Sequence, residues 1–218
     1  MIKFCWIALT TWIVGLMLSF TAPAIAAEAM VNSETKANVA ASNATAIFAG
    51  GCFWCMEQPF DDLVGVLDTT SGYTGGTVEN PSYTQVSNGN TGHLEAVKVT
   101  YNPAEVSYDK LLEVFWHNVD PVDNRGQFCD KGSQYRSAIF YQNEQQEANA
   151  KDSKVALTGS GKLNQAIATT IRPASAFYPA EDYHQDYYQT HPVRYKLYRF
   201  ACGRDQRLEE IWGAAAAH

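Results

Sequence analysis

Residues 49–60 read AGGCFWCMEQPF, in which two glycines precede a pair of cysteines at C-x-x-C spacing. The residues before the glycines, ATAIFA, form a short apolar run, which predicts a strand that ends in a tight turn. A helix is predicted to begin between Cys52 and Trp54 and to be disturbed at Pro59. The stretch therefore predicts a strand, a glycine turn and a helix, with Cys52 at the helix start.

The two cysteines, Cys52 and Cys55, are candidates for redox chemistry. A helix N-terminus and C-x-x-C spacing both lower the pKa of a thiol, so the sequence predicts a nucleophilic thiolate at Cys52. A plain disulfide or a pair of buried, unreactive thiols are the alternatives that the spacing leaves open. The intervening rings, Phe53 and Trp54, could wall a pocket for a small apolar group such as a methyl, with core packing as the alternative for either ring.

No metal site and no nucleic-acid partner are predicted. Zinc needs four convergent ligands, whereas Cys129 and Cys202 are single and distant, and no two histidines stand at ligand spacing. The formal net charge is −7 and there is no long basic run, which argues against nucleic-acid binding.

Residues 1–26 have the pattern of a secretory signal peptide: a lysine, a mostly apolar run and the small-residue signature A-I-A. We therefore expect export to the periplasm or another extracytoplasmic space, with no stable membrane insertion after cleavage. An uncleaved N-terminal membrane anchor is the alternative. Residues 27–44 are predicted to be a disordered linker, residues 45–213 one domain, expected to be monomeric, and residues 214–218 a disordered tail.

Apolar patterning predicts an α+β fold, with helices packed against one sheet. The segment at residues 94–102 alternates apolar and polar residues, which predicts a half-buried strand. Two segments rich in turn-forming residues, 80–93 and 124–137, are predicted to be irregular loops. The other strands are expected at 64–76, 137–142 and 165–175, and the helices at 108–119, 143–157, 180–192 and within 194–213.

Six motifs follow one another along residues 46–213: GCFWCMEQPFDDLVGV, SGYTGG, NPSYTQVSNGNTGHLEAVKVTYNP, LLEVFWHNVDP, DKGSQYRSAIFY and AEDYHQDYY. In this order they resemble the A-type peptide-methionine sulfoxide reductases, in the subgroup that has a cysteine in place of glycine after GCFW. The resemblance implies a two-layer α/β sandwich around a mixed, mostly antiparallel sheet. It also makes residues 45–213 the catalytic domain.

The implied reaction is the reduction of methionine S-sulfoxide, free or in proteins, to methionine. The implied reductant is an external dithiol such as a thioredoxin-like protein, with no bound cofactor. Carried over residue by residue, the resemblance assigns the following roles: Cys52 is the nucleophile, Phe53 and Trp54 hold the methyl group, Glu95 donates a proton, Tyr83 and Tyr135 hydrogen-bond the sulfoxide oxygen, Asp130 belongs to the same polar network, and His184 and Tyr187 belong to the substrate site.

The chemistry constrains Glu95. A sulfoxide is attacked at sulfur only as its oxygen gains a proton, so the donor must be protonated near neutral pH, and a glutamate meets that condition when burial raises its pKa. Partial burial of Glu95 is therefore expected, with an ordinary surface glutamate as the alternative.

Attack leaves Cys52 as a sulfenic acid, which a second thiol converts to a disulfide. Cys55 is predicted to resolve Cys52 first because closing so short a loop needs little chain movement. Cys202 is the alternative resolving residue, and Cys129 is interpreted as a bystander. Two rival functions use the same residues: a thioredoxin-type disulfide oxidoreductase or isomerase, and a non-catalytic module that binds oxidised methionine.

Overall fold

The computed structural model describes residues 43–213. The predicted signal peptide, all but the end of the predicted linker, and the predicted tail lie outside the described residues. Within that range, no helix is long and apolar enough to cross a membrane.

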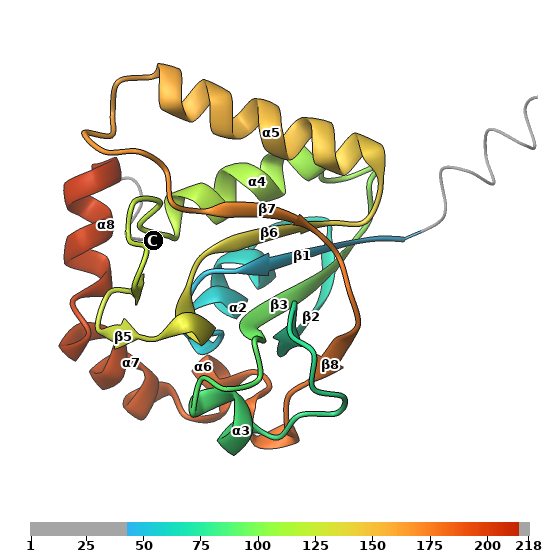
Figure 1. The fold of residues 1–218 in the computed structure, drawn as a ribbon, viewed down its shortest axis with the longest axis vertical. Coiled ribbons are helices and arrows are strands. Elements are labelled where there is room, and N and C mark those ends of the chain that lie inside the picture. The colour runs from blue at the N-terminus through green and yellow to red at the C-terminus, as the bar shows by residue number, and fades with distance from the viewer. Residues whose placement is uncertain (1–42, 214–218) are drawn as a thin grey trace, which may run out of the picture. The chain divides into compact units, whose positions relative to one another are not determined.

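A six-stranded sheet forms the centre of the domain (Figure 1). Only β6 and β7 pair in parallel, and the other neighbours are antiparallel, which confirms the mixed, mostly antiparallel sheet. A separate two-stranded hairpin joins β4 to β5. In sheet order the strands are β7 (Thr170–Pro173), β6 (Ala138–Tyr141), β1 (Ala44–Ala49), β3 (Leu94–Tyr101), β2 (Val66–Thr74) and β8 (Phe177–Pro179); the hairpin is β4 (Gly126–Gln127) and β5 (Asp130–Lys131).

Helices α2, α4 and α5 supply the main core that packs on one face of the sheet, and α4 and α5 lie side by side (Figure 1). Alternation along β1 divides its side chains, so that Phe48 enters this core and Ile47 faces the other side. The helices are α2 (Trp54–Asp61), α3 (Tyr83–Ser87), α4 (Tyr108–His117), α5 (Glu144–Gly159), α6 (Tyr187–Thr190), α7 (Pro192–Ala201) and α8 (Arg204–Trp212), with 3₁₀ turns η1 (Ser133–Tyr135) and η2 (Asp182–His184).

The strand β3 is more buried than its alternating sequence predicts. It lies between β1 and β2, and its residue Ala96 is buried in a small cluster on the face away from the helices. Ala174 and Phe177, which flank the turn between β7 and β8, pack on that cluster. The prediction of a half-buried strand is therefore wrong. The apolar pattern of a single strand does not reveal that other segments cover the second face of the sheet.

Both predicted irregular loops contain regular structure. Residues 80–93 include α3, where the Ser82 side chain accepts a hydrogen bond from the Gln85 backbone N–H at 3.4 Å and the Gln85 side chain accepts from the Ser82 N–H at 2.9 Å. Residues 124–137 include β4, β5 and η1. The segment after His191 contains two helices, α7 and α8, with a break at Gly203, which adopts a left-handed φ of +67° that glycine tolerates best.

One fully buried cation, Arg204, joins the start of α8 to three parts of the domain. Its guanidinium donates hydrogen bonds to the carbonyl oxygens of Gly50 at 3.2 Å and Asn118 at 2.6 Å, and stacks 4.4 Å from the ring centroid of Phe128. These contacts anchor the C-terminal helices to the glycine turn and to the end of α4.

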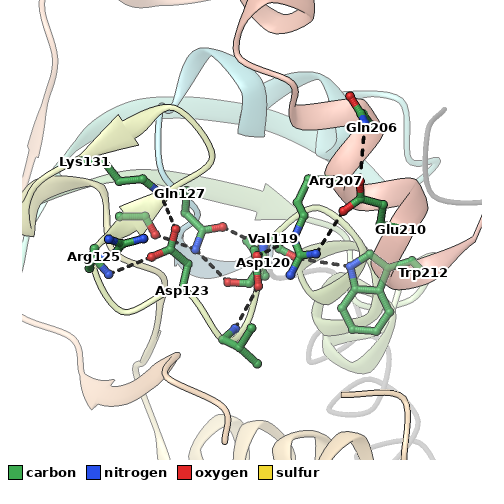
Figure 2. Close-up of polar contacts among 12 residues, drawn as sticks. Val119, Asp120, Asp123, Arg125, Gln127, Lys131, Gln206, Arg207, Glu210 and Trp212 are labelled. Atoms are coloured by element: carbon green, nitrogen blue, oxygen red, sulfur yellow. Dashed lines mark hydrogen bonds and ion pairs between the residues drawn. The ribbon is translucent and has the colours of Figure 1, made fainter. Parts of the chain in front are cut away.

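The exposed side of α8 is fixed by weaker contacts (Figure 2). Arg207 pairs with Asp120 at 2.8 Å, and the Trp212 indole N–H donates to the Val119 carbonyl at 3.2 Å. Asp120 also exchanges hydrogen bonds with Gln127 on β4, at 2.8 Å each. The segment after α4 therefore connects α8 to the β4–β5 hairpin.

Arg204→Ala is expected to lower the free energy of unfolding by about 2–5 kcal/mol, as large-to-small changes at buried sites do. Arg207→Ala is the matched control, since a partly exposed ion pair contributes about 0–1 kcal/mol. Urea unfolding of both variants measures the difference. Equal losses in the two variants would contradict the anchoring role of Arg204.

Candidate active site

The glycine turn places Cys52 just before the start of α2. Gly51 has a φ of +83°, and a Cβ there would lie 2.6 Å from the Cβ of Gln127, so no larger residue fits. Phe53 is the N-cap of α2, and Cys52 precedes it. The predicted order of strand, turn and helix is confirmed.

The two thiols are free, buried and adjacent. Burial, the neighbouring Cys55 and the charge of Glu95 together raise the pKa of Cys52 well above its usual value. A hydrogen bond from Cys52 lowers the pKa of Cys55 to about 7, in spite of burial and with help from Arg204. Burial thus raises the Cys52 pKa where the sequence predicts a lowered one, and Cys55 has the lower pKa of the two thiols.

Glu95 is buried beside the thiols, at the start of β3. Its side chain is 1% exposed, and Oε2 accepts a hydrogen bond from the Phe53 backbone N–H at 3.2 Å. Burial raises the pKa of Glu95 to about 8, against that hydrogen bond and with a further rise from Asp130. The expected burial is confirmed, and the alternative of a surface glutamate is wrong, so the carboxyl is mostly protonated at neutral pH.

Two half-buried phenols, Tyr83 and Tyr135, lie within electrostatic range of both Glu95 and Cys52. Burial raises the pKa of Tyr83 to about 12 and raises that of Tyr135 as well, and the two phenols share a hydrogen bond. Tyr83 is held by Glu181, whose carboxylate accepts its backbone N–H at 2.9 Å. Both phenols are thus protonated donors next to the carboxyl group of Glu95.

A third phenol, Tyr198 on α7, was not predicted from the sequence. It donates to Asp130 Oδ2 at 2.5 Å and hydrogen-bonds the Cys52 thiol. Burial raises the pKa of Asp130 despite that hydrogen bond. No motif marks Tyr198, because α7 approaches the site from a distant part of the chain.

Aromatic side chains from α2, η2 and α6 pack against one another beside the thiols. Trp54 is half-buried and stacks on Tyr187, with ring centroids 3.8 Å apart and planes 7° apart. The Trp54 indole N–H donates to Nδ1 of His184 at 3.1 Å, and burial lowers the pKa of His184, which keeps that nitrogen an acceptor. Phe53 is 1% exposed and packs 5.0 Å from the His184 ring. His184 and Tyr187, which the resemblance assigns to the substrate site, are buried and contact Trp54.

A family model described as peptide methionine sulfoxide reductase matches residues 44–216. The chain belongs to the peptide methionine sulfoxide reductase family. Two relatives named peptide methionine sulfoxide reductase MsrA are similar to it at about the same level. The Bacillus licheniformis protein is 52% identical over 168 residues, which are 77% of this chain and 93% of that protein. The Streptococcus agalactiae serotype III protein is 53% identical over 167 residues, which are 77% of this chain and 98% of that protein.

Solved structures from the family have the same fold. Mxr1 from Saccharomyces cerevisiae in reduced form has a TM-score of 0.66 and 31% identity, covering 70% of this chain and 87% of that one. Methionine sulfoxide reductase A of Corynebacterium diphtheriae has a TM-score of 0.64 and 33% identity, covering 70% of this chain and 77% of that one. The fold expected from the resemblance is thereby confirmed.

The two other cysteines within residues 43–213 are joined. Cys129, at the tip of the β4–β5 hairpin, forms a disulfide with Cys202, at the end of α7, with Cα atoms 4.9 Å apart. Cys129, interpreted from the sequence as a bystander, is thus a disulfide partner, and Cys202 is bonded to Cys129 rather than to Cys52. Because 73 residues separate the two cysteines, their spacing in the sequence does not indicate that they pair.

Proposed function

We propose that this protein reduces methionine S-sulfoxide, free or in proteins, to methionine through the thiol of Cys52. The observation that carries the proposal is the buried carboxyl of Glu95, protonated at neutral pH and hydrogen-bonded to the N–H of the residue after Cys52. A nucleophilic sulfur beside a protonated acid is the pair that attack on a sulfoxide requires.

The first step transfers oxygen from substrate to enzyme. Cys55 takes the proton of Cys52 through their hydrogen bond, and the Cys52 thiolate attacks the sulfoxide sulfur. Glu95 protonates the oxygen, methionine leaves, and Cys52 keeps the oxygen as a sulfenic acid. The negative charge that began on Cys55 then lies on Glu95, which recovers a proton from solvent.

The second step forms a disulfide. The Cys55 sulfur attacks the sulfenic acid, its proton joins the departing hydroxyl, and water leaves. Cys55 is placed for this attack because its thiol already contacts Cys52. Exchange with an external dithiol, such as a thioredoxin-like protein, then returns both thiols, and no bound cofactor takes part.

The substrate would be held by rings and phenols. Trp54 offers its half-buried ring to the methyl group with Phe53 behind it, while Tyr83 and Tyr135 donate hydrogen bonds to the sulfoxide oxygen. Asp130 orients Tyr198, whose phenol reaches the nucleophile. His184 and Tyr187 are positioning residues for Trp54, as their contacts indicate.

Cys52→Ser is expected to abolish methionine formation, because a hydroxyl is far less nucleophilic than a thiolate. Cys55→Ser should still form one methionine per enzyme, because Cys52 alone takes up the oxygen, but more slowly, because Cys55 no longer accepts the proton of Cys52. Recycling of this variant by a thioredoxin-like protein should fail. Chromatographic assay of methionine, with and without the reductant, measures both. Normal cycling of Cys55→Ser alongside failure of Cys202→Ser would make Cys202 the resolving residue.

Glu95→Gln keeps the shape of the side chain and removes the acid, so the single-turnover rate should fall by roughly 10²–10⁴-fold. In the parent enzyme the acid form is lost as pH rises through about 8, so the rate of oxygen transfer should decline above that pH. The variant should lack that decline. A rapid-quench pH series on both proteins tests this, and an unchanged rate in Glu95→Gln would assign the proton to another donor.

We further propose that the protein is exported and is a monomer. The support for export is the pattern of residues 1–26, so the mature N-terminus is expected near Ala27. N-terminal sequencing of protein from the extracytoplasmic fraction measures this. An intact leader on soluble protein in that fraction would contradict cleavage.

A further inference from the structure

A cavity of about 300 Å³ lies at the end of the sheet where β3, β6 and β7 begin. These three strands run in the same direction, because β3 and β6 are antiparallel to β1 and β7 is parallel to β6. The walls of the cavity include Leu94, Asp123, Arg136, Ala168 and Arg172. A volume of this size is at the small end of the range for ligand sites, so the cavity fits a small molecule.

The cavity is separate from the thiol site, although both lie at this end of the sheet. Leu94 belongs to the cluster on the face away from the main core, whereas the next residue, Glu95, hydrogen-bonds the N–H of Phe53. Successive side chains along a strand point to opposite faces, so the cavity lies behind Glu95. Arg136 likewise follows Tyr135, whose phenol lies within electrostatic range of Glu95.

Arg172 on β7 is held in place and keeps donors for a ligand. Its Nη2 donates to the Gly75 carbonyl oxygen at 2.9 Å, and its guanidinium lies 5.3 Å from the ring centroid of Phe140. A guanidinium has five N–H donors, and the hydrogen bond to Gly75 uses one of them. The side chain is therefore oriented before a ligand arrives, which lowers the entropy cost of binding.

A second guanidinium, that of Arg136, reaches the same cavity. Arg136 is exposed, and its Nε donates to the Ser133 carbonyl oxygen at 3.4 Å, which is a long hydrogen bond. Within the described range, residues 43–213, neither Arg136 nor Arg172 forms a salt bridge. Both cations are thus available to an anion that enters the cavity.

The acid in the wall, Asp123, does not compensate these two charges. Its carboxylate is paired with Lys131 on β5 and accepts the backbone N–H of Arg125 at 2.9 Å (Figure 2). The charges of Asp123 and Lys131 cancel, so Arg136 and Arg172 leave the cavity positive in a chain whose formal net charge is −7. Such a cavity favours an anionic ligand.

The walls also indicate which anion fits. A guanidinium binds carboxylate or phosphate oxygens through two parallel hydrogen bonds, so two guanidiniums fit a molecule with two anionic groups. The cavity has more room than one phosphate ion fills, and such an ion would leave the apolar side chains of Leu94 and Ala168 without a contact. A short carbon chain with a carboxylate at each end meets both conditions.

We propose that this cavity binds a small dicarboxylate, with one carboxylate on Arg136 and the other on Arg172. The inference is independent of the thiol chemistry and adds a second ligand site to the domain. Two sources offer a pair of carboxylates: a free dicarboxylate, and two adjacent acidic side chains of another protein.

Isothermal titration calorimetry with succinate tests the site, in about 0.1 M sodium chloride to screen weak surface attraction. One succinate per chain is expected to bind. Arg136→Gln and Arg172→Gln should each raise the dissociation constant at least ~10-fold, because each removes charge-assisted hydrogen bonds. Arg194→Gln is the matched control, since it removes the same charge from an exposed position on α7, and it should bind like the parent.

Two further ligands serve as controls for the chemistry. Succinamide, which has the shape of succinate without its charges, should not bind. A blocked dipeptide of two aspartates distinguishes the sources, because binding of this peptide but not of succinate, with the same loss in both arginine variants, would assign the carboxylates to another protein.

The variants must be folded for the comparison to hold. Unchanged thermal unfolding in the absence of ligand shows this, and Arg136→Gln alters an exposed side chain, so it keeps the test valid if Arg172→Gln does not fold. No saturable binding of succinate or the peptide, or equal weakening in Arg194→Gln, would overturn the proposal. Inorganic phosphate binding as tightly as succinate would overturn the assignment of a dicarboxylate.

Discussion

The buried guanidinium of Arg204 is the contact on which the site depends. It accounts for the position of α8, because one of its terminal nitrogens donates to carbonyl oxygens from the glycine turn at Gly50 and from Asn118 at the end of α4. A buried charge without such partners would be costly, so the chain is confined to arrangements that bring these groups together. The helix before it, α7, is thereby held over the two thiols, where Tyr195 and Tyr198 close the site.

Burial then sets the chemistry of the site. Removing Cys52, Glu95 and Asp130 from water raises all three pKa values, and each negative charge raises those of its neighbours. The site consequently keeps Glu95 mostly protonated at neutral pH, and Cys55 has the lower pKa of the two thiols. A nucleophile and an acid can therefore coexist at neutral pH, which two groups with ordinary pKa values would not do.

The aromatic residues of the site differ in exposure: one ring is partly open to solvent, and buried rings hold it in place. Trp54 keeps one side partly open, while stacking on Tyr187 and the hydrogen bond to His184 fix its orientation. Because the supporting rings come from η2 and α6, the orientation of Trp54 depends on the same C-terminal segment as the rest of the site. The strand–turn–helix around Cys52 supplies both thiols and Trp54, whereas the C-terminal segment fixes the orientation of the Trp54 ring.

The sequence by itself determined the local features of this protein. The strand before Cys52, the glycine turn and the start of the helix after it follow from the local sequence, and the motif order identified the family. The tertiary structure alone decided the pairing of Cys129 with Cys202, the approach of Tyr198 and the burial of Cys52 and Glu95. Those properties arise from burial and from contacts between residues far apart in the chain, and neither spacing nor composition encodes how deeply a group is removed from water or which distant charge faces it.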